Sequence, residues 1–383
     1  MGLDEDVRAE LSALEASHRL RTPRVVDGAG GAMITLDGAT VLNLSSNDYL
    51  GLAADPRVSG AASAALAEHG TGAGASRLIT GTHRLHEALE SAVADWLHAP
   101  AARLFSSGYA ANLGVLTTLL RPCDVVFSDE LNHASIIDGC RLARATIVVY
   151  PHGDVAALAA LLGRHAGPRQ LVVTESLFSM DGDIVDVEAL ARATRAAGAA
   201  LIVDEAHAIG CHGVEGRGVC AARGVVPDVL VGTFGKALGT YGAFAACSAD
   251  IAALLWNRAR SFVFSTALPP SVAAATLESL AIVRGVEGAE RRTRLEEHAR
   301  RLRARVPGIG GAPTSAIAPI LVGDDREVMR LTGQLLAAGV FVQGIRPPTV
   351  PPGTARLRVS LSAALAADQV ERAAGLLCDV VRP

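Results

Sequence analysis

The sequence has little cysteine, and its cysteines are not spaced as zinc ligands are. Six are scattered through 383 residues, and no two of them form a Cys-x-x-Cys pair. The spacing that is typical of a zinc site is therefore missing, and we predict no metal. Most of these thiols should be small buried side chains. The six are Cys123, Cys140, Cys211, Cys220, Cys247 and Cys378.

Long apolar runs are also missing, although half of the residues are hydrophobic. A membrane-spanning helix needs about 20 consecutive apolar residues. The stretch that comes nearest, residues 241–256, is interrupted by Asp250. The acidic start "MGLDEDVRAELSALE" lacks the apolar core of a signal peptide. The sequence thus predicts a soluble cytoplasmic protein with no membrane partner.

No charge of one sign dominates, since the formal net charge is −4. This balance gives no electrostatic reason to expect nucleic acid as a partner. The arginine-rich segment 291–305 has glutamates and leucines at helical spacing and no interleaved aromatic residues. It predicts a solvated helix face rather than a nucleic-acid site.

Helix-like and strand-like segments alternate from about residue 55 to residue 270. The apolar, β-rich runs are "ARLFSS", "CDVVFSD", "TIVVYP", "LVVTES", "LIVDEA", "VLVGTF" and "GAFAACS". This alternation predicts an α/β fold with a mainly parallel sheet that helices cover on both faces. We expect three parts: an N-terminal helix and β-hairpin segment (1–50), a large α/β domain (51–270) and a small C-terminal α+β domain (271–383).

The sequence has a single lysine, Lys236, in the stretch "PDVLVGTFGKALG". A strand-like run leads there into a glycine-rich turn. A phosphate-binding P-loop would need a glycine at 230 and Ser or Thr at 237, but the chain has Leu230 and Ala237. A P-loop nucleotide binder is therefore disfavoured. "GAGGAM" (28–33) lacks the third glycine of a dinucleotide fingerprint and is interpreted as a turn.

Three other strand ends have polar residues that could meet a ligand, because open α/β sheets bind ligands at the carboxyl ends of their strands. "FSSGYAANLG" places Ser107 and Gly108 before a helix, where free N–H groups suit a phosphate, although an ordinary helix cap fits equally well. Asp204 ends the run "LIVD", and His207 follows; an N-cap is the alternative for Asp204. His133 is either a hydrogen-bonded core histidine or a residue that stacks on a flat ligand.

Together these strand ends offer a phosphate cradle, a carboxylate, two histidines and a lysine. Pyridoxal 5'-phosphate (PLP) has the complementary parts: a phosphate, a ring nitrogen, an aromatic face and an aldehyde that reacts with a lysine amine. Partial burial of Lys236 would make its amine a better nucleophile. PLP is the cofactor that the residues favour.

Eight longer motifs follow one another along the chain: "LNLSSNDYLGL", "GTGAGASRLITGTHRLHEALE", "FSSGYAANLG", "LNHASIIDG", "TESLFSMDGDIVDVEAL", "LIVDEAHAIG", "GTFGKALG" and "STALPP". In these motifs and their order the chain resembles, over nearly its whole length, the α-oxoamine synthases, a branch of the fold-type I PLP-dependent transferases. The resemblance implies that Lys236 forms the Schiff base with PLP, that Asp204 pairs with the ring nitrogen, that His207 bonds the ring hydroxyl oxygen and that His133 stacks on the ring.

The same resemblance implies further contacts. Gly108 and Tyr109 are expected to offer their backbone N–H groups to the phosphate. Ser179 and Thr233 are expected to lie close by, and Ser107 is a further cofactor-binding candidate. Ser265 and Thr266 are expected to reach the phosphate of a neighbouring subunit, so the active unit would be a homodimer with shared sites. Asn47 and Arg358 resemble ligands of the amino-acid carboxylate, although Arg356 and Arg358 alternate on a strand and one of them could face solvent. Arg21, Thr349 and Arg346 are the remaining candidates for substrate contact.

Within this family, "SSNDYLG" and "IRPPTVPPGTARLRVSL" favour the biotin-pathway branch. That branch implies an acyltransferase that condenses L-alanine with pimeloyl-CoA or pimeloyl-acyl carrier protein and releases carbon dioxide and the thiol. A sister synthase that uses glycine is the alternative. A non-catalytic PLP-binding module is a further alternative, which the full set of catalytic residue types disfavours.

Overall fold

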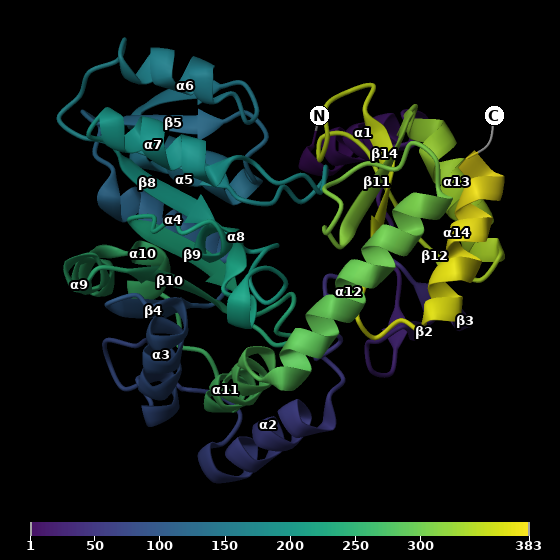
Figure 1. The fold of residues 1–383 in the computed structure, drawn as a ribbon, viewed down its shortest axis with the longest axis horizontal. Helices are drawn as coiled ribbons and strands as arrows, with labels where there is room; N and C mark the ends of the chain where they lie inside the picture. Colours follow the sequence, from purple (N-terminus) through teal and green to yellow (C-terminus); the bar gives the residue numbers. More distant parts are fainter. Residues whose placement is uncertain (1, 382–383) are drawn as a thin grey trace. The chain divides into compact units, whose positions relative to one another are not determined.

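The computed structural model describes residues 2–381, whose contacts divide into two compact units (Figure 1). The larger unit comprises residues 50–179 and 184–293. The smaller unit comprises residues 1–49, 180–183 and 294–383, as far as they are described. No helix of the described residues is long and apolar enough to cross a membrane.

A seven-stranded sheet forms the centre of the larger unit, in the order β4-β10-β9-β8-β7-β5-β6. The strands from β9 to β6 in this order are parallel to one another, while β10 runs antiparallel to both of its neighbours. The predicted α/β fold with a mainly parallel sheet is confirmed. The strands are β4 (Ala101–Phe105), β5 (Val125–Asp129), β6 (Thr146–Tyr150), β7 (Gln170–Glu175), β8 (Ala200–Asp204), β9 (Val229–Thr233) and β10 (Ala243–Cys247).

Most helices of the larger unit begin at a polar cap. The side chains of Asp55, Ser107, Asp154, Asp186 and Ser248 each accept a backbone N–H of the first turn, which satisfies a donor that the helix itself leaves open. The helices are α2 (Pro56–His69), α3 (Arg84–Leu97), α4 (Gly108–Leu119), α5 (Ala134–Ala143), α6 (Val155–Leu162), α7 (Val187–Ala196), α8 (Gly218–Ala222), α9 (Ala249–Arg258), α10 (Arg260–Val263) and α11 (Pro270–Arg284), with a short 3-10 turn at Val214–Gly216.

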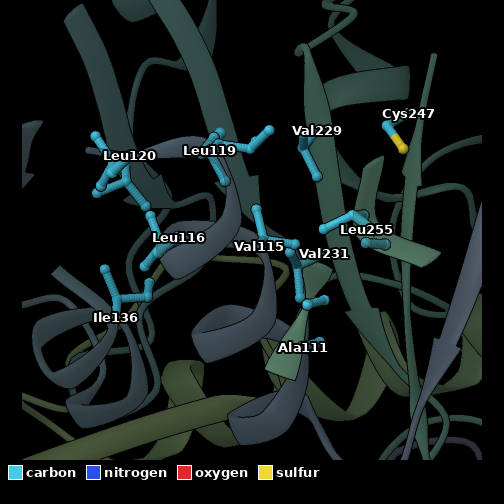
Figure 2. Packing of buried hydrophobic residues seen from close by; sticks show 14 of the residues in the cluster. Ala111, Val115, Leu116, Leu119, Leu120, Ile136, Val229, Val231, Cys247 and Leu255 are labelled. Carbon is cyan, nitrogen blue, oxygen red and sulfur yellow. The ribbon is translucent and has the colours of Figure 1, made fainter. Parts of the chain in front are cut away.

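Helix α4 lies in the core of the larger unit. Figure 2 shows its Val115 and Leu119 near Val229 and Val231 of β9, within one cluster of buried side chains. A Cβ on Gly114 would meet the Phe105 ring at 2.7 Å, so this helix packs against β4 as closely as a glycine permits. The expectation of buried cysteines is confirmed for Cys140, Cys211, Cys220 and Cys247, whereas Cys123 is exposed and Cys378 is half-buried.

The smaller unit contains two sheets. One has the order β1-β2-β3-β12, and its Ile34, Leu36 and Val41 form a cluster of buried apolar side chains. The other is antiparallel, in the order β11-β14-β13. The elements are α1 (Leu3–Ala16), β1 (Val26–Asp27), β2 (Met33–Leu36), β3 (Ala39–Asn43), β11 (Ile317–Gly323), α13 (Asp325–Ala337), β12 (Val340–Phe341), β13 (Gln343–Ile345), β14 (Ala355–Ser360) and α14 (Ala367–Val381).

The contacts group the chain differently from the three parts that we expect from the sequence. Residues 271–293 belong with the larger unit, because α11 packs on α2 and α3. The N-terminal segment belongs with the C-terminal residues, because β3 pairs with β12. Helix α12 (Val286–Arg305) contributes residues to both units. As a division into domains, the three-part scheme stays a prediction.

Candidate active site

Three neighbouring strands of the larger unit end in polar side chains. Glu175 ends β7, Asp204 ends β8 and Thr233 ends β9. Glu175 and Asp204 are register partners, so the two carboxyl groups stand on adjacent parallel strands at the same edge of the sheet. Both are almost fully buried, with 4% and 5% of their surface exposed. A polar, buried edge of this kind is where a parallel sheet binds its ligand.

Lys236 lies in the tight turn that follows β9. Its Nζ is 2.7 Å from Nε2 of His207, so the amine and the imidazole are directly hydrogen-bonded. The turn is closed by a bond from the Gly239 N–H to the Lys236 carbonyl. Gly239 has φ +64°, and a Cβ there would meet the Ala53 nitrogen at 2.3 Å, so only glycine fits. The backbone therefore fixes where the lysine side chain begins.

The Asp204 carboxylate accepts two hydrogen bonds inside the protein. The Asn112 side chain donates to Oδ2 at 2.7 Å, and the Ala206 N–H donates to Oδ1 at 2.8 Å. The second bond closes a local turn, but no helix of the described residues begins there, so the N-cap alternative for Asp204 is wrong. A buried carboxylate is costly unless charge partners surround it. A protonated ring nitrogen is such a partner, so this site fits PLP.

His133 is the N-cap residue of α5. Its Nδ1 accepts the Ser135 N–H at 3.2 Å, and its own N–H donates to Oε1 of Glu175 at 2.7 Å. The contacts of His133 within the protein are thus those of a hydrogen-bonded capping histidine, which is one of the two roles considered from the sequence. The other role, stacking on a flat ligand, stays a prediction. Burial lowers the pKa of His133. Burial also raises the pKa of Glu175, and the charge of the neighbouring Asp204 raises it further.

The start of α4 has the geometry that a phosphate needs. The Ser107 hydroxyl accepts the Ala110 N–H, while helix geometry leaves the N–H groups of Gly108 and Tyr109 without an intrahelical acceptor. A Cβ on Gly108 would lie 3.9 Å from Cβ of Thr233, which places this helix start beside the end of β9. The Thr233 hydroxyl donates to the Gly242 carbonyl and accepts the Gly235 N–H, so it also closes the turn that bears Lys236.

Ser179, Ser265 and Thr266, the remaining predicted cofactor contacts, also belong to the larger unit. Ser179 is half-buried after β7. Ser265 and Thr266 follow α10, where Thr266 forms an antiparallel bridge with Ser76. In the part of the chain that the structure describes, no hydrogen bond joins either Ser265 or Thr266 to the cluster around Lys236.

Asn47 and Arg358 come together within the smaller unit. The Arg358 guanidinium donates to the Asn47 side-chain oxygen at 3.3 Å and to the Ser360 hydroxyl at 2.7 Å. Arg358 and Arg356 are 7% and 6% exposed, and Arg356 is paired with Asp181. The expectation that one of these two arginines could face solvent is wrong, because β14 is buried along its whole length.

Arg21, Arg346 and Thr349 line one cavity of about 370 Å³, also within the smaller unit. The Arg21 guanidinium donates to the Thr349 hydroxyl at 3.1 Å, and Arg346 donates to the His18 carbonyl. Burial, and next the charge of Arg21, lower the pKa of Arg346. Two guanidinium groups lining one cavity make it favourable for an anion.

Three buried residues of the site were missed by the sequence reasoning: Asn112, Ser135 and Glu175. Glu175 ends a strand in "LVVTES", so the rule that selected Asp204 could also have selected it. Asn112 and Ser135 give no such signal, because their contacts arise only when α4 packs against α5.

The sequence is similar to a known enzyme family over nearly its whole length. The sequence model of the aminotransferase class I and II family matches residues 39–377. An 8-amino-7-oxononanoate synthase of Geobacter metallireducens is 47% identical over 97% of this chain and 96% of its own length. One of Acidithiobacillus ferrooxidans is 44% identical over 99% of both chains.

The chain belongs to the 8-amino-7-oxononanoate synthase family, within aminotransferase class I and II. The resemblance stated from the sequence motifs is confirmed. A solved serine palmitoyltransferase of S. paucimobilis with PLP and myriocin bound has a TM-score of 0.94 and 32% identity, over 99% of this chain and 98% of that one. A solved 8-amino-7-oxononanoate synthase of Francisella tularensis has a TM-score of 0.76 and 29% identity, over 89% and 98%. The fold-type I class is confirmed too.

Proposed function

We propose that this chain is a PLP-dependent acyltransferase that condenses L-alanine with a pimeloyl thioester, as the names of its 8-amino-7-oxononanoate synthase relatives indicate. The reaction gives 8-amino-7-oxononanoate, carbon dioxide and the free thiol, for biotin synthesis. The observation that supports it most is the direct contact between Lys236, the only lysine of the chain, and His207 in the turn beside the buried Asp204 carboxylate.

Bound PLP supplies an electron sink that stabilises negative charge on the α-carbon of an attached amino acid. Lys236 would hold its aldehyde carbon, and no other ε-amine exists in the chain to do so. Asp204 would hold the protonated ring nitrogen, with Asn112 and Ala206 fixing the carboxylate. Gly108 and Tyr109 would bind the phosphate through the free N–H groups at the start of α4.

Lys236 and His207 can move a proton at the α-carbon of alanine. A lysine amine takes a proton only when it is neutral, and Nε2 of His207 lies within hydrogen-bond distance of Nζ to share or relay that proton. Asn47 and Arg358 are our proposed ligands of the alanine carboxylate, because a guanidinium fixed by Ser360 presents its donors in one orientation. A fixed carboxylate orients the bond that breaks, which lowers the barrier by positioning alone.

The cavity that Arg21, Arg346 and Thr349 line is our proposed site for the far carboxylate of the pimeloyl group. Its two guanidinium groups would neutralise that charge, whereas an uncharged acyl chain would gain nothing from them. This assignment gives a reason for a preference for a dicarboxylate over a simple fatty acyl donor.

We also propose a homodimer in which Ser265 and Thr266 reach the phosphate of the second copy. The residues around these hydroxyls support it, since Phe264 is 72% exposed and Ile79, close to the bridge with Ser76, is 75% exposed. Large apolar side chains at such exposure favour coverage by a partner. A cytoplasmic location stays a prediction.

The test is a product assay with PLP-loaded protein and L-alanine. Pimeloyl-CoA and pimeloyl-acyl carrier protein are offered separately, with glycine in place of alanine and octanoyl-CoA in place of the dicarboxylate as controls. We expect mass spectrometry to find 8-amino-7-oxononanoate only with alanine and a pimeloyl donor. Equal or better turnover with glycine would assign the chain to a sister activity instead.

A further inference from the structure

Asn112, on the first turns of α4, joins two groups of the site. Its side chain is 2% exposed, and its Nδ2 donates to Oδ2 of Asp204 at 2.7 Å and to Oγ of Ser135 at 3.0 Å. An amide nitrogen has two hydrogens, and both are used here. The carboxylate can only accept, which fixes the orientation of the amide. Ser135 must therefore accept the other hydrogen.

The Ser135 hydroxyl passes this constraint on to His133. Its oxygen lies 2.7 Å from Nδ1 of His133, and its single hydrogen is available for that nitrogen because the oxygen already accepts from Asn112. The Ser135 N–H points to the same Nδ1 at 3.2 Å. A backbone N–H can only donate, so Nδ1 is an acceptor and the ring proton is on Nε2.

We propose that Asn112 and Ser135 are positioning residues that transmit the orientation of the Asp204 carboxylate to His133, and keep that histidine neutral with its proton on Nε2. This role rests on the proposed function, in which His133 faces the cofactor. It extends that function to two residues that bond Asp204 and His133.

Charged groups around His133 act on its protonation in opposite directions. Asp204 on β8 and Asp138 on α5 both favour the imidazolium, while burial and Lys236 oppose it. Glu175 on β7 also faces His133, through its bond to the His133 N–H. Burial is the largest of these effects, and the pKa of His133 is lowered. Protonation of Nδ1 would also set its N–H against the Ser135 backbone N–H and would force the Ser135 hydroxyl to turn, and this additional cost favours the neutral ring.

The test uses Asn112→Leu and Ser135→Ala, each loaded with PLP. Asn132→Leu is the matched control, since Asn132 is equally buried and its Nδ2 also bonds a serine hydroxyl and one further acceptor, but neither Asp204 nor His133. Long-range ¹H–¹⁵N spectra of ¹⁵N-histidine protein report the protonation of each ring nitrogen, and the His133 signals are assigned by their absence in His133→Gln.

In the parent and the control we expect the neutral ring with the proton on Nε2 down to pH 6. In Asn112→Leu the hydroxyl of Ser135 can turn, so the titration of His133 should move to higher pH than in the parent, and kcat should fall more between pH 8 and pH 6 than it does in the parent. Ser135→Ala should shift the titration in the same direction, because it removes the hydroxyl that donates to Nδ1.

An unchanged tautomer and an unchanged acid side of the pH profile in Asn112→Leu would overturn the proposal. If Asn112→Leu does not fold, an unshifted titration of His133 in Ser135→Ala is enough to overturn the proposal. The nitrogen signals need no substrate. They therefore decide on this role even if the parent protein makes no product from alanine and a pimeloyl donor, a result that would reject the proposed function only.

Discussion

Glu205 allows a quantitative prediction about stability near the site. It follows Asp204, is fully buried, and accepts the Cys220 N–H through Oε1 at 2.9 Å. Its other oxygen is so close to the backbone of Gly218 that a Cβ there would lie 1.5 Å away. Burial is the main reason that the pKa of Glu205 is raised to about 7, from 4.5.

This raised pKa makes the folded state bind more protons than the unfolded state between about pH 4.5 and pH 7. The stability that the neutral carboxyl contributes is therefore complete below pH 4.5 and is lost as the pH rises through 7. A shift from 4.5 to 7 corresponds to at most about 3 kcal/mol. In Glu205→Gln the titration disappears, while the amide oxygen can still accept the Cys220 N–H. We expect this variant to gain up to about 3 kcal/mol over the parent between pH 5 and pH 8.

Urea unfolding followed by tryptophan fluorescence is a suitable assay, because both tryptophans, Trp96 and Trp256, lie in the larger unit together with Glu205. The PLP-loaded proteins are compared at pH 5 and pH 8, with the exposed Glu87→Gln as the control. A difference between Glu205→Gln and the parent that is the same at both pH values would refute the reasoning.

Three further predictions concern the site and its turn. Asp204→Asn should still bind PLP but exchange the α-proton of alanine with D₂O at least ~100-fold more slowly, as followed by NMR, because an amide cannot hold the ring nitrogen protonated; undiminished exchange contradicts the pairing. Arg346→Met should raise KM for the pimeloyl donor about tenfold while alanine binding stays unchanged, since one charge-assisted bond is worth ~1.5 kcal/mol or more; an unchanged KM contradicts the proposed carboxylate site. Gly239→Ala should lower the free energy of unfolding by at least ~2 kcal/mol, against about 1 kcal/mol for Gly224→Ala, which has the same φ of +64° but no atom within 4 Å of its Cβ; equal costs in thermal unfolding would show that the close approach to Ala53 is relieved.

The sequence was sufficient for the elements of the larger unit. Each of the seven apolar runs coincides with a strand, from "ARLFSS" at β4 to "GAFAACS" at β10, because a buried strand is a short run of β-branched and apolar residues between turns. The arginine-rich segment 291–305 lies within α12, as its periodicity predicts. Local pattern also led to Lys236, Asp204, His133 and His207, since each stands at or just after a strand end.

Long-range pairing was not accessible in the same way. Nothing local indicates that β10 runs antiparallel between β4 and β9, or that β3 pairs with β12 from the other end of the chain. The contacts of Asn112 share this property, because residues 112, 135 and 204 meet only after the sheet and both helices have assembled. Side-chain networks behind a site depend on tertiary packing, and their members look like ordinary helix residues in the sequence.

The most direct test of the account is to find where PLP attaches. The PLP-loaded protein is reduced with borohydride, digested and mapped by mass spectrometry, with the lysine-free variant Lys236→Arg treated in parallel. We predict one pyridoxyl group per chain, on the peptide that contains residue 236, and none in the variant. A parent protein that takes up PLP but retains no label, or that is labelled only at its N-terminal amine, would contradict the central role of Lys236.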